Sequence, residues 1–157
     1  MLDIFDELKS VVTGLADHKI DYALCGGLAM GVHGRARTTI DIDLLILSES
    51  LDDVLALANT LGYNVRGKDL TLADGAIEIR RVSKIDAHDG DLLSLDLILV
   101  TAEIRHAWES RIEGEWEGGK LSVVSPEGLI AMKLFRRSGR DLDDIQELSG
   151  ESLDDES

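Results

Sequence analysis

With 157 residues, the chain is long enough for one domain with a hydrophobic core and too short for two of ordinary size. Its apolar fraction of 44% and charged fraction of 30% are ordinary for a globular protein, and no apolar run approaches the roughly 18 residues that cross a bilayer. Cys25 is the single cysteine, which excludes an internal disulfide framework and fits a reducing compartment. Together with the lack of a long apolar run, this predicts a cytoplasmic protein with no membrane partner.

The net charge of −15 at pH 7 is unevenly spread along the chain. Residues 141–157 include eight acidic residues and no lysine or arginine, which leaves −7 for residues 1–140. This pattern is typical of a solvated end, so we expect one domain over residues 1–148 and a disordered acidic tail over residues 149–157. Residues 1–140 are also acidic overall, so we expect no broad basic surface that could bind nucleic acid. A phosphate-bearing ligand would need local cations or a metal ion.

The first 47 residues predict a helix, a strand, a glycine turn with a short helix, and a second strand. Apolar residues recur every three or four positions over residues 2–18, which predicts an amphipathic helix. Residues 21–25, DYALC, predict a short strand, and the small residues after them predict a tight turn into a helix that ends near Gly34. The β-branched run TTIDIDLLIL predicts a longer strand over residues 38–47.

The middle of the chain predicts a capped helix followed by two strands. Ser50 and Asp53 have the spacing of a capping box before the run LDDVLALANTLG, a helix that Gly62 would end. The runs AIEIRRVS (76–83) and SLDLILV (94–100) are rich in branched apolar residues, as strands are.

The last part of the chain predicts three helices and a hairpin. Residues 102–112 predict a helix, and the glycine pair in EWEGGKLSVV predicts a short hairpin. Ser125 is a favoured N-cap, and Pro126 after it suits the first helical position. We expect that helix to reach Gly139 and a last helix to cover residues 140–148. Together these elements predict one α/β domain with a mixed sheet.

Two aspartates interrupt an otherwise apolar strand. In TTIDIDLLI the two-residue strand period places Asp41 and Asp43 on one face, and on the other it places Ile40, Ile42, Leu44 and Ile46. Carboxylates spaced in this way repel each other, which raises a pKa unless a cation lies between them. A hard divalent ion, held by one or two carboxylates and substrate phosphates, is a natural partner. The alternative is a strand whose aspartates simply face water.

A glycine turn and a third acid favour a site over a solvated strand. Gly26 and Gly27 end one strand and open a helix, which leaves backbone N–H groups free to approach an anion, although a double glycine alone is only a turn. Asp96 lies in a strand of Leu and Ile that has no structural use for an acid, whereas Asp91 follows HDG and is expected to face water in a turn. Three acids on neighbouring strands favour a two-metal phosphoryl-transfer site.

The order of these motifs resembles the nucleotidyltransferase superfamily that includes DNA polymerase beta, and more closely its small bacterial AbiEii-like members. The stretch GGLAMGVHGRARTTIDIDLLI is similar to their first motif, and LIAMKLFRRSGRDLDDIQEL (129–148) is similar to their C-terminal helix pair. The resemblance implies an α/β (α+β) nucleotidyltransferase fold. In that fold, helices flank a mixed, mainly antiparallel sheet, and a helical pair ends the domain.

The resemblance also implies a reaction, the metal-dependent transfer of a nucleoside monophosphate from an NTP to an acceptor hydroxyl with release of pyrophosphate. In this interpretation Asp41 and Asp43 hold two Mg²⁺ (or Mn²⁺) ions, and Asp96 completes the second metal site near the attacking hydroxyl. The backbone amides of Gly26 and Gly27 bind the leaving pyrophosphate. Lys133 would reach the triphosphate as a point charge, unless it is an ordinary surface lysine.

Four more residues are candidates for nucleotide binding by resemblance: Arg37, Thr39, Arg140 and Asp141. Many superfamily members have Gly-Ser at the glycine turn, but here Leu28 follows the two glycines. Phosphate contacts must therefore come from backbone amides, from threonines such as Thr39, or from arginines such as Arg37. Arg140 and Asp141 lie at the turn between the last two helices, where such a pair could equally stabilise the junction.

The residues leave the acceptor open among a tRNA end, a protein side chain and a small molecule such as an aminoglycoside. The acidic charge argues against nucleic acid, since phosphate contacts need lysine and arginine. The AbiEii-like resemblance adds a role as the toxin of a toxin–antitoxin pair, with an antitoxin or another partner subunit bound to the chain.

Two other function classes stay open. One is a non-catalytic nucleotide-binding or partner-binding module that kept the fold, against which the intact triad of Asp41, Asp43 and Asp96 counts. The other is a sugar transferase with an Asp-x-Asp metal site, which explains neither the glycine turn nor the helix that carries Lys133.

The acidic tail is expected to be dispensable. A chain that ends at Gly150 should keep the melting temperature and nucleotide affinity of the full chain, because a solvated end contributes no packing. Thermal denaturation and a nucleotide titration of both chains measure this. A large drop in melting temperature after truncation would show that the tail packs on the domain.

Overall fold

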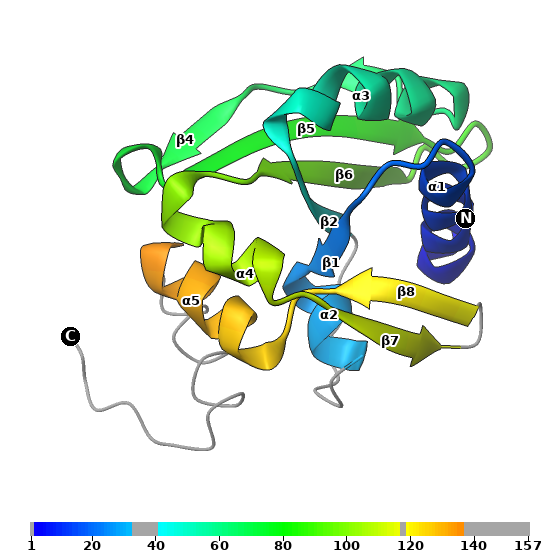
Figure 1. The fold of residues 1–157 in the computed structure, drawn as a ribbon. Helices are drawn as coiled ribbons and strands as arrows, with labels where there is room; N and C mark the ends of the chain where they lie inside the picture. Colours follow the sequence, from blue (N-terminus) through cyan, green and yellow to red (C-terminus); the bar gives the residue numbers. More distant parts are fainter. Residues whose placement is uncertain (1, 33–40, 117–118, 137–157) are drawn as a thin grey trace.

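The computed structural model describes residues 2–32, 41–116 and 119–136. Within these ranges a single eight-stranded sheet runs through the molecule in the order β3-β5-β6-β2-β1-β8-β7, with β4 beside β5 (Figure 1). Its strands are β1 (Ala23–Cys25), β2 (Asp41–Ile46), β3 (Val65–Arg66), β4 (Leu70–Leu72), β5 (Ile77–Ile85), β6 (Leu92–Leu99), β7 (Ile112–Trp116) and β8 (Gly119–Val123). The β1–β8 and β2–β6 pairs are parallel and the other described pairs are antiparallel, which confirms the mixed, mainly antiparallel sheet.

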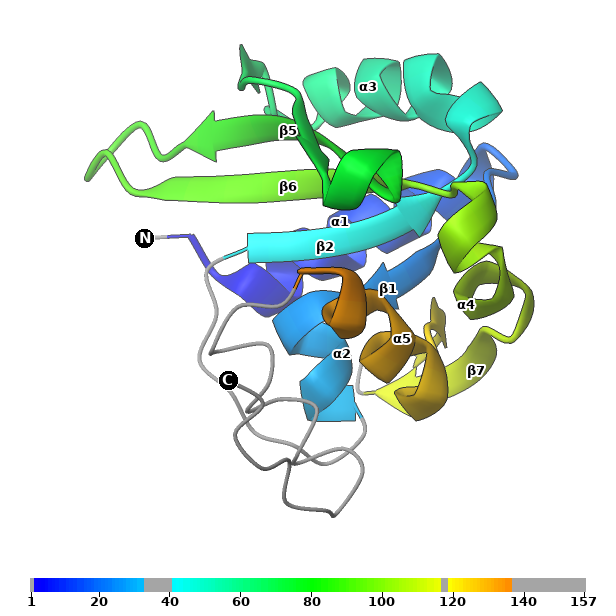
Figure 2. The ribbon, with the colours of Figure 1, turned by 90° about the vertical axis from the view of Figure 1, so that its left-hand side faces the viewer.

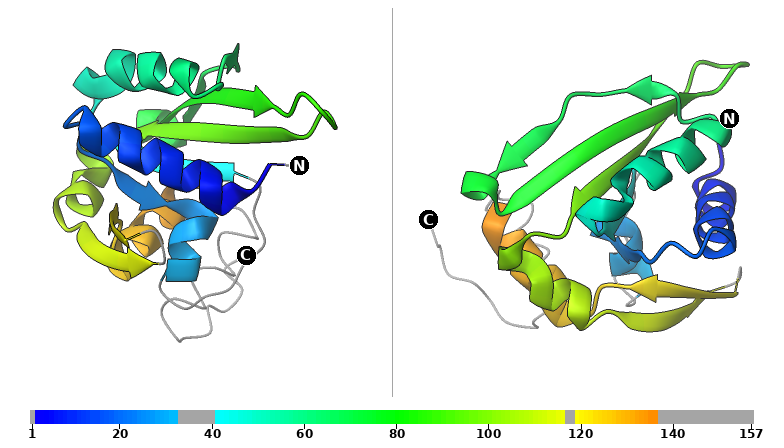
Figure 3. Two further views of the ribbon diagram at one scale, coloured as in Figure 1. Left: turned by 90° about the vertical axis from the view of Figure 1, so that its right-hand side faces the viewer. Right: turned by 45° about the horizontal axis from the view of Figure 1, so that its top comes forward.

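Helices cover both faces of the sheet. They are α1 (Ile4–Asp17), α2 (Gly26–Val32), α3 (Leu51–Thr60), α4 (Arg105–Glu109) and α5 (Pro126–Arg136), with the 3₁₀ turns η1 (Ser48–Ser50), η2 (Ala73–Gly75) and η3 (Ala102–Ile104). Figure 2 shows α2 and α5 below β2 and α1 behind it, and the opposite view on the left of Figure 3 shows α1 across the other face. We call these the α5 face and the α1 face of the sheet.

The hydrophobic core follows from the predicted patterns. On α1 the buried residues recur with helical spacing, at Leu8, Val11, Val12 and Leu15. The alternate residues Ile42 and Leu44 of β2 are completely buried. Across the described ranges, no helix is both long and apolar enough to span a bilayer.

Several predicted elements are confirmed. The hairpin of β7 and β8 is present, with Gly119 as the first residue of β8, and Ser125 Oγ accepts a hydrogen bond of 3.0 Å from the backbone N–H of Gly128, which is the expected N-cap of α5. Several expectations lie partly or wholly outside the described residues: the end of the short helix near Gly34, the start of the strand over 38–47, the end at Gly139 of the helix that begins at Pro126, the last helix over 140–148 and the tail over 149–157.

Other local predictions are wrong, in one case because of a local turn and in two because of strand pairing. Ser50 belongs to a 3₁₀ turn, has helical backbone angles and makes no side-chain cap hydrogen bond, so the capping box is absent from the start of α3. The helix predicted over 102–112 is only η3 and the short α4, because Ile112 pairs with Val123 and starts the β7–β8 hairpin. The strand predicted over 94–100 begins earlier, at Leu92, where it pairs with Ile85 of β5.

A polar cluster of Glu7, Tyr63 and Lys84 anchors α1 to the sheet. Glu7 accepts hydrogen bonds of 2.9 Å from the Tyr63 hydroxyl and of 2.9 and 3.1 Å from Lys84 Nζ. Tyr63 follows α3 and Lys84 lies on β5, so one carboxylate joins three separate segments. Burial of the ring, and then the hydrogen bond to Glu7, raise the pKa of Tyr63 well above its usual value.

Removal of this carboxylate should destabilise the fold. We expect Glu7→Ala to lower the free energy of unfolding by about 2 kcal/mol, because the Tyr63 hydroxyl and Lys84 lose a shared partly buried acceptor. Urea denaturation measures the change, and Asp6→Ala, at an exposed position of the same helix turn, is the control. An equal loss in both variants would assign the effect to acidic charge at the helix start instead.

Candidate functional site

The three predicted acids lie on one face of the sheet. Asp41 and Asp43 belong to β2, and the parallel register of β2 and β6 sets Asp43 beside Asp96 and Asp41 beside Ser94. Register partners on adjacent strands point to the same side, so all three carboxylates belong to the α5 face. Asp96 is buried, and Asp41 and Asp43 are half-buried.

Asp91 lies apart from these acids. It is exposed in the turn between β5 and β6, where its backbone N–H donates a hydrogen bond of 2.9 Å to Asp89 Oδ1. The polar neighbours of Asp91 predicted this position, and the apolar neighbours of Asp96 predicted its burial.

The cation beside the buried acid is an arginine. Arg81 of β5 lies opposite Asp96 in the antiparallel β5–β6 register. Its Nε donates to Asp96 Oδ1 at 2.6 Å and its Nη2 donates to Asp96 Oδ2 at 2.8 Å, so both carboxylate oxygens are engaged. Arg81 Nη2 also lies 4.0 Å from Asp41 Oδ2. The hydrogen bonds from Arg81 to Asp96, reinforced by the charges of Asp96, Asp41 and Asp43, raise the pKa of Arg81 above its usual value.

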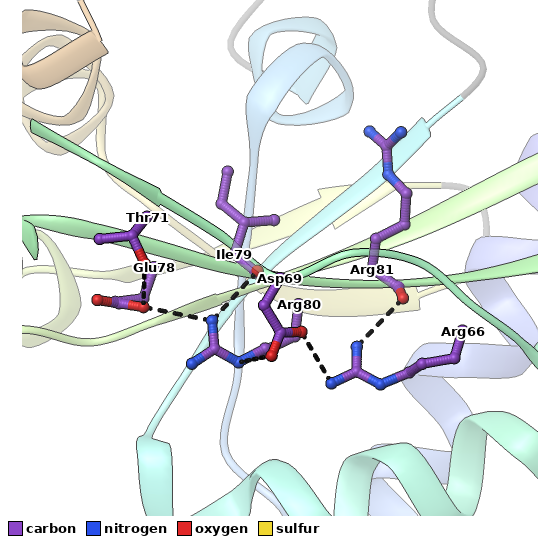
Figure 4. A network of polar contacts seen from close by, with 7 residues as sticks. All are labelled: Arg66, Asp69, Thr71, Glu78, Ile79, Arg80 and Arg81. Atoms are coloured by element: carbon purple, nitrogen blue, oxygen red, sulfur yellow. Dashed lines mark hydrogen bonds and ion pairs between the residues drawn. The ribbon is translucent and has the colours of Figure 1, made fainter.

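Arg81 is a site residue that the sequence motifs did not predict. In the run AIEIRRVS the strand period places Arg81 on the same side as Ile79. Arg80 lies on the opposite side, and Figure 4 shows this separation. Arg80 forms ion pairs with Asp69 at 3.4 Å and with Glu78 at 3.3 Å. The alternation could have assigned the two arginines to different faces, but pairing with Asp96 depends on a register between strands that the sequence does not display.

Gly26 is required by the carboxylate of Asp43. Gly26 has a φ of +71°, a left-handed conformation that favours glycine. A Cβ atom at residue 26 would collide with Oδ2 of Asp43. Asp43 lies there because it pairs with Cys25, the residue before Gly26, in the β1–β2 ladder. The glycine thus allows the Asp43 side chain to lie directly against the backbone where β1 passes into α2. Gly27 is half-buried in the first turn of α2.

A small cavity of about 30 Å³ lies between Asp43 and α5. Its polar lining includes Gly26, Asp43 and Lys133, and its apolar wall includes Ile79 of β5 and Met132 of α5. This volume holds about two water molecules. A nucleotide would therefore lie outside the cavity, over the half-exposed carboxylates, with Lys133 on the same side of the sheet.

The candidate metal site is not preassembled. Among the described residues, no three His, Cys, Asp or Glu side chains lie together in a way that could hold a metal ion. Both oxygens of Asp96 instead accept hydrogen bonds from Arg81. The donor set still fits a hard divalent ion, since carboxylate oxygens are its preferred ligands and the three acids share one face. Arg37, Thr39, Arg140 and Asp141 lie outside the described residues.

The fold is similar to those of several solved structures. A protein of Thermotoga maritima assigned as a nucleotidyltransferase gives a TM-score of 0.62 at 14% identity, over 94% of this chain and 91% of that one. ANT(2'')-Ia, an antibiotic-resistance factor solved in complex with adenylyl-2''-tobramycin, gives a TM-score of 0.64 at 15% identity, over 92% of this chain and 87% of that one. JHP933 of Helicobacter pylori gives a TM-score of 0.56 at 18% identity, over 91% of this chain and 63% of that one. At these identities the likeness shows the fold alone.

Comparison with curated proteins gave no significant match. One family model matches residues 1–151, and it describes nucleotidyltransferases of unknown function. This match confirms a nucleotidyltransferase family, as the motifs indicate, and does not confirm the AbiEii-like branch. The chain belongs to the nucleotidyltransferase family DUF6036.

Proposed function

We propose that the protein transfers a nucleoside monophosphate from an NTP to an acceptor hydroxyl and releases pyrophosphate. The observation that carries this proposal is the convergence of Asp41, Asp43 and Asp96 on one face of the sheet, beside the guanidinium of Arg81. Such a concentration of carboxylates at a half-exposed position has a high electrostatic cost unless it serves to bind cations.

In the proposed reaction, Asp41 and Asp43 hold Mg²⁺ or Mn²⁺, with Asp96 as the third acid. A divalent ion at these oxygens would neutralise triphosphate charge and polarise the phosphoryl group that is transferred. Lys133 and the backbone amides of Gly26 and Gly27 are proposed to bind the leaving pyrophosphate.

The bond changes are those of a substitution at phosphorus. The acceptor oxygen attacks the α-phosphorus, and the bond from that phosphorus to the oxygen bridging to the β-phosphate breaks. The hydroxyl proton passes to Asp96 or to water, and the electron pair of the broken bond leaves with pyrophosphate. Arg37, Thr39, Arg140 and Asp141 are proposed to contact the nucleotide from their places in the matching motifs.

A small-molecule hydroxyl is the acceptor that we favour. ANT(2'')-Ia, which has a similar fold, was solved with adenylyl-2''-tobramycin. The charge of −7 over residues 1–140 suits a cationic acceptor such as an aminoglycoside better than a tRNA, and a protein side chain is the third alternative. A toxin role with an antitoxin or partner subunit, and a cytoplasmic location, stay predictions from the sequence.

The competing function is a non-catalytic nucleotide-binding or partner-binding module. The observation that favours it is the ion pair between Arg81 and Asp96, since the charge of this buried acid is already compensated without a metal ion. An enzyme and a binding module differ in one decisive respect. Only the enzyme converts labelled NTP to pyrophosphate and a labelled acceptor.

The two acids of β2 should control metal binding. We expect Asp41→Asn and Asp43→Asn each to abolish Mn²⁺ binding in the presence of NTP, because an amide cannot supply the anionic ligand. Both variants should fold, since the amide keeps the shape of the side chain. Calorimetry measures the binding, and Asp69→Asn, in the Arg80 cluster on the α1 face, is the matched control. Undiminished metal affinity in both β2 variants would place the site elsewhere.

Asp96 should matter for transfer and Asp91 should not. We expect Asp96→Ala to lower transferase activity by a factor of ~100 or more, the scale of a lost catalytic base or metal ligand, and Asp91→Ala to stay within a few-fold. The assay is pyrophosphate release from each NTP with Mg²⁺ and a panel of aminoglycosides, RNA and cell extract. Full activity of the Asp96 variant would rule out the three-carboxylate mechanism.

A further inference from the structure

We propose that Arg81 is an exchangeable occupant of the carboxylate site, which a divalent ion must displace from Asp96 before the site can act. The inference rests on the proposed function and adds a regulatory step to it. In the metal-free protein the guanidinium neutralises the buried acid. When metal binds, Asp96 turns from an ion-pair partner into a metal ligand.

The geometry makes the two cations compete for Asp96. Nε and Nη2 of Arg81 engage one carboxylate oxygen each, at 2.6 and 2.8 Å. A divalent ion on either oxygen would stand within a few ångströms of the guanidinium, where like charges repel strongly. A divalent ion at Asp96 therefore weakens this bidentate contact and favours its opening.

The exposure of the two side chains shows which of them can leave. The Asp96 side chain is 9% exposed and the Arg81 side chain is 43% exposed. Arginine can move its charged head into water while its stem stays on the sheet, whereas Asp96 has no comparable path to solvent. The exchange therefore moves Arg81 and leaves Asp96 in place for the incoming ion.

Arg81 also faces the other two acids, which makes it a competitor for the whole cluster. Its Nη2 lies 4.0 Å from Asp41, and the charges of Asp41 and Asp43 both stabilise its charged form. Loss of this guanidinium removes one positive charge from beside three carboxylates. The affinity of these carboxylates for a divalent ion should then rise.

Arg80 provides a matched control one residue away. It has the same side chain on the same strand, but it faces the α1 side and pairs with Asp69 and Glu78 (Figure 4). Replacement of Arg80 also removes one arginine charge from the protein, but it removes it from the face opposite Asp41, Asp43 and Asp96. Any effect specific to Arg81 is therefore an effect of its place among the carboxylates.

The test is a titration with Mn²⁺ alone, followed by calorimetry, of the wild type, Arg81→Met and Arg80→Met. We expect about tenfold tighter binding for Arg81→Met, the size of a lost charge-assisted hydrogen bond, and a change below twofold for Arg80→Met. Unchanged or weaker binding in Arg81→Met, beside normal binding in the wild type, would overturn this inference and leave the proposed function intact. Absence of Mn²⁺ binding from both proteins would contradict both.

A second measurement uses the wild type, so it decides the question even if Arg81→Met does not fold. The Nε–H proton of Arg81 should exchange slowly with water in the metal-free protein and at least tenfold faster with saturating Mg²⁺, as followed by ¹⁵N NMR. The Nε–H proton of Arg80 should not change. Persistent protection of Arg81, while the backbone amides of Asp41 and Asp43 shift with Mg²⁺, would overturn the inference.

Discussion

The ion pair between Arg81 and Asp96 ties the stability of the sheet to the charge of the candidate site. The parallel pairing of β2 with β6 gathers Asp41, Asp43 and Asp96 on one face, and the antiparallel pairing of β5 with β6 adds Arg81. A buried carboxylate without a partner costs roughly 1–3 kcal/mol or more. The β2–β6 register thus creates the repulsion among the three carboxylates, and the β5–β6 register supplies the arginine charge that compensates it.

The rest of the domain is arranged around this charged face. Gly26 lets β1 pass into α2 directly over the Asp43 carboxylate, and α5 brings Lys133 to the cavity beside it. The opposite face carries the amphipathic helix α1, which Glu7 holds to Tyr63 and β5. The three candidate carboxylates therefore lie on one side of the sheet, while the buried side chains of α1 pack on the other.

The sequence predicted features that depend on a single element. The strand period assigned Asp41 and Asp43 to one face, and the apolar neighbours of Asp96 predicted its burial, because both patterns are local. Arg81 could not be predicted as the partner of Asp96, since that pairing depends on the register of β5 against β6. In the same way, the pairing of Ile112 with β8 overrode a local helical pattern. The roles of the site residues stay predictions.

The central claim is that this three-carboxylate face binds a divalent ion and a nucleotide. The most direct measurement is a crystal structure with Mn²⁺ and a non-hydrolysable NTP analogue, with the ion located by its anomalous scattering. We predict an anomalous peak between Asp41 and Asp43, within ligand distance of Asp96, and a guanidinium of Arg81 turned away from it. A nucleotide-bound structure with no metal at these acids, and with Arg81 still on Asp96, would contradict the account.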